Sequence, residues 1–384
     1  MQGMKVYLDN AATTPLAPEV FEAMAPILKD NFGNPSSTHS YGRTAKSFIE
    51  NARRTVARLI NAKPSEITFT SGGTEADNMA INCAVRDLGV TRIITSAIEH
   101  HAVLHTVEHI ASHENVQFQI VELDEWGRVK LDHLAQLLAA SNEKTLVTLM
   151  HANNEIGTLL PLEKVSQMCK EQGAYFHTDT VQTMGHYSFD MQALAIDFIT
   201  CAAHKLHGPK GVGFLYTNAS TKIKPLIHGG AQERGLRGGT ENIYGIVGLA
   251  KAMELAYESL EAHQNHVQEL KSYMIEGLRK CFGDEVGFHG TIVPEESLYT
   301  VLNVCLPASD KGSMLLFTLD LKGIACSGGS ACSSGSNLGS HVLTAIGADL
   351  SRPNVRFSFS RYTKKEEIDY VLEVLAEVYA KKLV

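Results

Sequence analysis

Short apolar runs alternate with segments of helical periodicity over more than half of the chain, and this alternation restricts the fold more than any other feature. Runs of strand length occur at residues 66–70, 92–95, 116–121, 146–150, 174–177, 198–203 and 212–215. Helical patterns lie between several of them. This order is typical of a mostly parallel sheet covered by helices on both faces. We therefore expect an α/β fold whose ligands bind beyond the carboxyl ends of the strands.

The length of 384 residues predicts one large domain and one smaller domain. A long helical stretch from Ile243 to about Leu278 separates the alternating pattern from a C-terminal part with fewer strands. We place the boundary inside that stretch, near Tyr257. Residues 15–257 would form the large domain, and residues 1–14 with 258–384 a smaller α+β domain that carries the loop around Cys332.

Composition excludes several classes of protein. Apolar content of 44%, charged content of 20% and a net charge of -8 are ordinary for a globular protein, and they argue against nucleic acid or a membrane as partner. The chain has no signal-peptide core after Met1 and no apolar run near 20 residues, so we expect a cytoplasmic protein. Seven cysteines without a C-x-x-C pair make a disulfide framework improbable.

Lys205 is the first candidate for chemistry. It follows the apolar run 198–203 and precedes a turn with Gly208 and Pro209. Burial at the end of a strand lowers the pKa of an amine and makes it nucleophilic, although a solvated loop lysine is the common alternative. Asp179 follows another apolar strand. A Schiff-base lysine with an aspartate for a pyridinium nitrogen is the pairing that pyridoxal phosphate (PLP) requires.

Three further positions could contact such a cofactor. The turn at residues 71–74 could bind a phosphate or simply cap a helix, and it lacks the P-loop spacing. His100 could stack on an aromatic ring, or serve as a cap or core residue. Asp179 could instead cap a helix, in which case Gln182 would share its face and reach the same ligand.

Cys332 lies in the most unusual stretch of the chain, because eight of the ten residues at 327–336 are Gly or Ser. Such a composition predicts a mobile, hydrated loop with an exposed, reactive thiol. A spare surface cysteine or metal binding with Cys326 are the alternatives. Arg356 lies within an apolar strand and needs an anionic partner, either a substrate carboxylate or an internal salt bridge.

Together these stretches resemble the cysteine desulfurases of the NifS/IscS type, which belong to the class V group of fold-type I PLP enzymes. The resemblance covers nearly the whole chain. It rests on motifs in the expected order: LDNAATTP (8–15), GNPSSTH (33–39), FTSGGTEADN (69–78), IEHHAVL (98–104), HANNEIGT (151–158), HTDTVQ (177–182), AHKLHGPKGVG (203–213), HGGAQERGLRGGTEN (228–242) and GGSACSSGS (328–336).

The resemblance implies a role for each matching residue. Lys205, Cys332 and His100 would be catalytic: Lys205 holds PLP as a Schiff base, Cys332 accepts sulfur and His100 stacks on the ring. The other implied cofactor contacts are Asp179 at the pyridine nitrogen, Gln182 at the ring hydroxyl, Asn154 beside the cofactor, Gly73, Thr74 and His204 at the phosphate, and Thr240 from the partner subunit of a homodimer. Asn154 and Arg356 would bind the substrate carboxylate, and no metal site is expected.

The implied reaction converts L-cysteine to L-alanine and leaves its sulfur on Cys332 as a persulfide. A sulfur-acceptor or scaffold protein would then take the sulfur for iron–sulfur cluster or thio-cofactor biosynthesis. A selenocysteine lyase, an aminotransferase or epimerase of the same fold, and a non-enzymatic sulfur or metal carrier remain alternatives. The chain departs from the family at Ala202, Gly239 and Gly328, where serine is more usual, and at residues 337–339.

Overall fold

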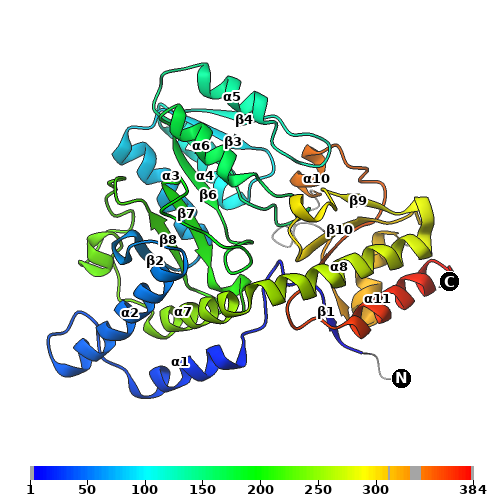
Figure 1. The fold of residues 1–384 in the computed structure, drawn as a ribbon, viewed down its shortest axis with the longest axis horizontal. Coiled ribbons are helices and arrows are strands. Elements are labelled where there is room, and N and C mark those ends of the chain that lie inside the picture. Colours follow the sequence, from blue (N-terminus) through cyan, green and yellow to red (C-terminus); the bar gives the residue numbers. More distant parts are fainter. Residues whose placement is uncertain (1–3, 310–311, 329–338, 382–384) are drawn as a thin grey trace.

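The computed structural model describes residues 4–309, 312–328 and 339–381. A seven-stranded sheet with strand order β2-β8-β7-β6-β5-β3-β4 forms its centre (Figure 1). β8 runs antiparallel to β2 and β7, whereas the other neighbouring pairs are parallel. The strands are β2 (Ile67–Thr70), β3 (Arg92–Ser96), β4 (Gln117–Val121), β5 (Thr145–Thr148), β6 (Tyr175–Asp179), β7 (Phe198–Ala202) and β8 (Gly213–Thr217). The expected mostly parallel α/β sheet is confirmed.

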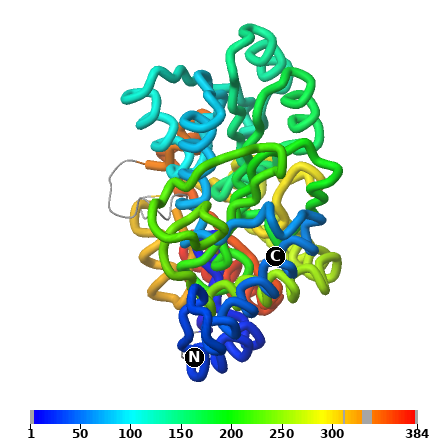
Figure 2. The backbone as a smooth tube through the Cα atoms, turned by 90° about the vertical axis from the view of Figure 1, so that its left-hand side faces the viewer, coloured from blue at the N-terminus to red at the C-terminus, as the bar shows by residue number. Residues whose placement is uncertain are grey.

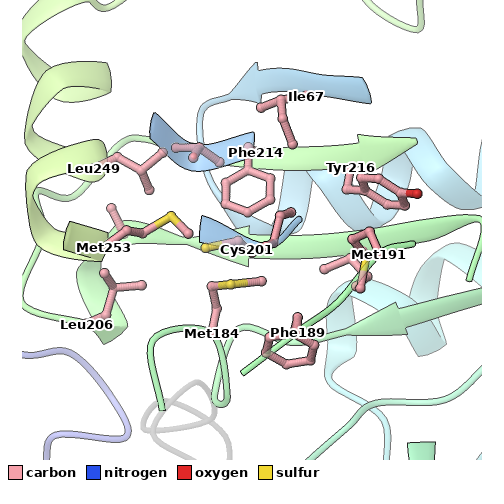
Figure 3. Close-up of a cluster of buried hydrophobic side chains, with 14 of the residues drawn as sticks. Ile67, Met184, Phe189, Met191, Cys201, Leu206, Phe214, Tyr216, Leu249 and Met253 are labelled. Atoms are coloured by element: carbon pink, nitrogen blue, oxygen red, sulfur yellow. The ribbon is translucent and has the colours of Figure 1, made fainter. Parts of the chain in front are cut away.

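Side chains of the sheet alternate between two hydrophobic clusters, one on each face. Phe214 and Tyr216 of β8 belong to a cluster with α7, whereas Leu215 belongs to a cluster with α3 and α4. Leu249 and Met253 of α7 lie near Phe214 in the first cluster (Figure 3). The helices around this sheet are α1 (Pro18–Asp30), α2 (Ser40–Leu59), α3 (Gly73–Leu88), α4 (His101–His113), α5 (Leu131–Ala139), α6 (Leu162–Glu171) and α7 (Ile243–Glu258). Burial on both faces explains why every residue of β2, β3, β5, β7 and β8 is buried, whereas four of the five residues of the edge strand β4 are exposed.

A second, smaller unit has its own hydrophobic cluster. A three-stranded antiparallel sheet of order β12-β10-β9 and the parallel pair β1-β11 pack there against the helices. Its elements are β1 (Val6–Tyr7), α8 (Leu260–Phe282), β9 (Gly287–His289), β10 (Val301–Cys305), α9 (Leu315–Leu321), β11 (Ile324–Ala325), α10 (His341–Ala345), β12 (Asn354–Ser358) and α11 (Lys365–Val378). Among the described residues, no helix is both long and apolar enough to cross a membrane.

The helical stretch predicted from Ile243 to about Leu278 is two helices. Ser259 leaves the helical conformation (φ -127°, ψ 31°) and separates α7 from α8. Buried side chains of α7 belong to the cluster of the large sheet, and those of α8 belong to the cluster of the smaller unit. The break therefore lies where the chain passes from one core to the other. The exact division into domains at Tyr257 stays a prediction.

One of the local alternatives is wrong, and two helices were not anticipated. No helix follows β6, so Asp179 is not a helix cap; its Oδ1 accepts a hydrogen bond from the backbone N–H of Val181 at 2.8 Å in a turn. Gln182 therefore shares no helix face with Asp179. The unpredicted helices are α5 and the short α10, although Leu131, Leu134 and Leu138 of α5 do have helical spacing.

Candidate active site

A cavity of about 370 Å³ lies where the carboxyl ends of β6 and β7 meet the first turns of α3 and α4. Parallel strands end at one edge of a sheet, and such edges are where α/β proteins bind ligands. Most residues singled out from the sequence line this cavity: Gly73, Thr74, His100, Asn154, Asp179, Gln182, His204, Lys205 and Arg356. Ala11 lines the same cavity, so residues more than 300 positions apart in the chain face one space.

Lys205 ends a short 3₁₀ turn, Ala203–Lys205, that directly follows β7. Its Nζ donates hydrogen bonds to the backbone carbonyl oxygens of Ala11 and Ala12, the latter at 2.9 Å. Thr14 holds the same two segments together, because its Oγ1 donates to the carbonyl oxygen of His204 at 2.9 Å. The N-terminal loop thus fixes the lysine side chain, a function that its sequence alone did not reveal.

Asp179 is the carboxylate at the floor of the cavity. Burial, followed by the neighbouring Asp77 carboxylate, raises the pKa of Asp179 to about 7. The hydrogen bond from Val181 and the charge of Lys205 act in the opposite direction. A buried acid of this kind is stabilised in its ionised form by a cationic partner, which a protonated ring nitrogen would supply.

Asp77 and His177 form a buried pair that the sequence reasoning missed. Asp77 Oδ1 lies 3.4 Å from His177 Nε2, and His177 Nδ1 lies 2.7 Å from Thr148 Oγ1. Burial raises the pKa of Asp77 to about 8 and lowers that of His177 to about 4. Only the motif at residues 69–78 pointed to Asp77, because a polar residue within a helix gives no sign of burial on its own.

His100 is the N-cap of α4. Its Nδ1 accepts a hydrogen bond from the backbone N–H of Ala102 at 3.1 Å, which confirms the capping alternative. Burial and the charge of Lys205 lower the pKa of His100 to about 4, so the ring is neutral at physiological pH. A neutral imidazole is also suited to stack on an aromatic ring. Stacking on a cofactor stays a prediction.

The predicted phosphate-binding residues gather at the start of α3. Gly72, the N-cap, provides no side-chain cap, so the N–H groups of the first turn remain open to an anion. A Cβ at Gly73 would lie 2.8 Å from Val181 Cγ2, so the backbone here packs too closely for a side chain. Burial lowers the pKa of His204 to about 4, and Ala202 lines the cavity with a methyl group where a hydroxyl is more usual.

Arg356 is almost fully buried in β12 with 1% of its surface exposed. Its Nη2 forms a salt bridge with Asp9 Oδ1 at 2.8 Å, and its Nη1 donates to the carbonyl oxygen of Asn154 at 2.8 Å. The internal salt bridge expected as one alternative is therefore present. Its Nε is buried and has no hydrogen-bond partner among the described residues.

One predicted site residue is not described by the structure, and another does not line this cavity. Cys332 lies outside the described residues. Thr240 is exposed and does not line the cavity of its own subunit. Cys326, the alternative metal partner of Cys332, is half-buried, and burial raises the pKa of its thiol to about 12. Within the described part of the chain, no cluster of three or more His, Cys, Asp or Glu side chains could hold a metal ion.

Comparison with known proteins agrees with this fold and cavity. The model of the family "Aminotransferase class-V" matches residues 6–371, and the chain belongs to that family. Within it, the chain is similar to cysteine desulfurases. Those named IscS from Dictyoglomus turgidum and Methanosarcina thermophila are each 44% identical over 98% of this chain, and the matches cover 95% and 92% of the two relatives.

The chain is also similar to solved structures of NifS-like proteins and related proteins. A NifS-like protein has a TM-score of 0.90 at 38% identity and covers 98% of this chain and 100% of its own. The structure named "SspA in complex with cysteine" has a TM-score of 0.79 at 34% identity, with 94% and 100% covered. The resemblance drawn from the motifs is confirmed.

Proposed function

We propose that the protein is a PLP-dependent cysteine desulfurase that converts L-cysteine to L-alanine and retains the sulfur as a persulfide on Cys332. The observation that carries this proposal is the convergence of Lys205, Asp179 and Arg356 on one cavity, in a chain that matches cysteine desulfurases over nearly its full length. A solved relative named for its complex with cysteine supports the same substrate.

The residues of the cavity fit PLP. Asp179 offers the carboxylate that a ring N–H⁺ requires, Gln182 the amide for the ring hydroxyl, and Lys205 the amine for the aldehyde. Gly73, Thr74 and His204 would hold the phosphate at the uncapped start of α3. When bound, the cofactor withdraws electrons from the α-carbon of an attached amino acid.

The protein's own groups supply the remaining chemistry. Arg356 and Asn154 would hold the substrate carboxylate and so set the orientation of the α-carbon. Lys205 would take the proton from that carbon, because its amine is freed when the substrate replaces it. The Cys332 thiolate then attacks the substrate Sγ: the S–S bond forms, the Cβ–Sγ bond breaks, and Cβ takes up a proton to become the methyl group of alanine.

Both ends of the segment that contains Cys332 are attached to cavity residues. Ser327 exchanges two backbone hydrogen bonds with Arg356, at 3.2 and 2.6 Å. Ser340 Oγ donates to Glu155 Oε2 at 2.5 Å. Five residues from Ser327 to Cys332 span at most about 18 Å. This tether supports the assignment of Cys332 as the sulfur acceptor.

We further propose a homodimer in which Thr240 completes the phosphate site of the partner subunit. Phe21 and Leu28, one face of α1, are 58% and 54% exposed, and an apolar face of this kind favours burial in an interface. α1 lies at the edge of the molecule opposite α5 (Figure 2). Sedimentation of the wild type and of Leu28→Asp tests the dimer: a monomeric wild type would refute it.

The experiment for the main proposal compares the wild type with Cys332→Ala. On addition of L-cysteine, the wild type is expected to form alanine and a persulfide on Cys332, detected by mass spectrometry of the alkylated peptide. The variant is expected to keep its cofactor absorbance and to form no persulfide. Undiminished sulfide release by the variant would exclude the role of Cys332. Capture of the protein that takes up the labelled persulfide sulfur would then identify the acceptor and decide whether iron–sulfur or thio-cofactor biosynthesis follows.

A further inference from the structure

The turn that follows β6 packs against the turn at residues 203–208, which contains Lys205 and is called the lysine turn below. Gly185 has a φ of 79°, and a Cβ there would lie 3.4 Å from the Cβ of Leu206 and 3.1 Å from that of Ala256 in α7. Glycine allows this close approach at a positive φ. The next residue, His186, lines a second, small cavity of about 20 Å³ together with Leu206.

His186 connects Lys205 to the smaller unit through its ring. The ring donates a hydrogen bond to the backbone carbonyl oxygen of Lys205. Its Nδ1 lies 2.9 Å from the hydroxyl oxygen of Tyr299, and the same hydroxyl oxygen lies 3.3 Å from the carbonyl oxygen of His186. Tyr299 is buried and belongs to the hydrophobic cluster of the smaller unit. One side chain thus joins the lysine turn to the second core.

These two hydrogen bonds fix the tautomer of His186. Burial lowers its pKa to about 4, the hydrogen bond to Lys205 acts in the opposite direction, and the charges of Arg361 and His263 lower the pKa further. The ring is therefore neutral at physiological pH, and a neutral imidazole has one N–H. That N–H bonds the Lys205 carbonyl, so we assign it to Nε2, and Nδ1 accepts the hydroxyl hydrogen of Tyr299.

The N-terminal loop holds the other side of the lysine turn. Thr14 Oγ1 accepts a hydrogen bond from the backbone N–H of His207 at 2.8 Å, and His207 Nδ1 lies 2.9 Å from the carbonyl oxygen of Pro15. His207 has a φ of 65°, in the left-handed region that L residues adopt infrequently. A backbone of this kind persists only where the surrounding contacts hold it. The shape of the lysine turn therefore depends on its neighbours on both sides.

We propose that His186 is a positioning residue for Lys205, and that Tyr299 extends this contact to the smaller unit. This inference rests on the proposed function of Lys205. Its amine must bond PLP and later take a proton from the substrate α-carbon, and both steps depend on where the amine is held. His186 does not line the active-site cavity. It acts through the peptide group of Lys205, from which the lysine side chain extends.

The test compares two substitutions at His186. His186→Phe keeps a planar ring and loses both hydrogen bonds, whereas His186→Gln keeps an amide N–H that can donate to the Lys205 carbonyl. In the His186→Phe holoenzyme, kcat for alanine formation is expected to fall about 10- to 100-fold, with the KM for cysteine within about threefold of the wild type. His186→Gln is expected to restore kcat to within about threefold of the wild type.

A second readout does not depend on turnover. The rate at which Lys205 of the apoprotein combines with added PLP, followed by absorbance, is expected to fall about 10-fold in His186→Phe and to recover in His186→Gln. A purely structural role would instead give equal losses in the two variants.

Tyr299→Phe tests the link to the smaller unit and leaves the lysine turn itself unchanged. It removes the hydroxyl that fixes the ring of His186, so kcat is expected to fall about 3- to 10-fold. Added to His186→Phe, the same substitution is expected to have no further effect on kcat, because both act on one contact. Wild-type kcat in Tyr299→Phe would overturn the link to the smaller unit.

His263→Phe is the matched control. His263 of α8 lines the same small cavity, and within the described part of the chain it forms no hydrogen bond to the lysine turn, so we expect wild-type rates. Wild-type kcat in His186→Phe, or equal losses in His186→Phe and His186→Gln, would overturn the inference alone. A wild type that forms no bond between PLP and Lys205 would overturn the proposed function, and this inference with it.

Discussion

Asp179→Asn is expected to stabilise the cofactor-free protein and to weaken the cofactor-bound one. Burial raises the pKa of Asp179 from 3.8 to about 7. Because the folded value lies above the unfolded one, the folded state is favoured by a protonated Asp179, and this stability is lost as the pH rises toward and through 7. Asn has the same shape, still accepts the hydrogen bond from Val181, and has no charge to bury.

The size of the effect follows from the same shift. Integrating the proton linkage gives a relative stabilisation of Asp179→Asn of about 4 kcal/mol at pH 8 and about 1.5 kcal/mol at pH 5. An unfolding entropy of roughly 2.1 cal/mol/K per residue converts these values into increases in Tm of about 5 °C and about 2 °C. With PLP bound, Asp179→Asn is expected to destabilise the protein instead. The ring N–H⁺ pairs with the Asp179 carboxylate and cannot pair in this way with an amide.

Thermal unfolding of the apoprotein between pH 5 and 8, with and without PLP, tests this reasoning. The exposed Asp132 provides a matched control, since Asp132→Asn makes the same chemical change on the surface of α5. We expect the increase in Tm only for Asp179→Asn, larger at pH 8 than at pH 5, and a smaller gain on addition of PLP than in the wild type. An apo Asp179→Asn that is less stable than the wild type at pH 8 would refute the argument.

Two other substitutions probe the two ends of the cavity. Ala202→Ser adds the hydroxyl that is more usual in the family. One new hydrogen bond to the phosphate is expected to tighten PLP binding by about 2- to 10-fold in a titration of the apoprotein. Unchanged or weaker binding would contradict a phosphate site beside residue 202. Arg356→Lys keeps the charge, but a lysine cannot donate hydrogen bonds to Asp9, to the Asn154 carbonyl oxygen and to a substrate carboxylate in the same geometry. The KM for cysteine is therefore expected to rise about 10- to 100-fold, with a smaller change in kcat. An unchanged KM would remove Arg356 from the substrate site.

The elements that the sequence predicted well are those with strong local patterns. All seven strands of the large sheet were predicted to within two residues at each end. Buried strands and amphipathic helices have periodicities that a short window captures. The turn after β6 had no such signal. An aspartate such as Asp179 is favoured both at helix N-caps and in turns, so its type alone does not distinguish the two.

The cavity itself depends on contacts that no local pattern contains. The strand order inserts β5 between β3 and β6, and the first turns of α3 and α4 line one cavity with the carboxyl end of β6. The salt bridge between Arg356 and Asp9 joins residues from opposite ends of the chain. Lys205 and Asp179 were identified because each follows an apolar strand, whereas the burial of Asp77 and the position of His186 required the folded structure.

The account depends most directly on the covalent attachment of PLP to Lys205. The purified protein, reduced with borohydride and digested, should contain a phosphopyridoxyl group on the peptide that includes Lys205, and Lys205→Ala should contain none. Recovery of that peptide without the modification from fully loaded protein, or the modification on another lysine, would contradict the account.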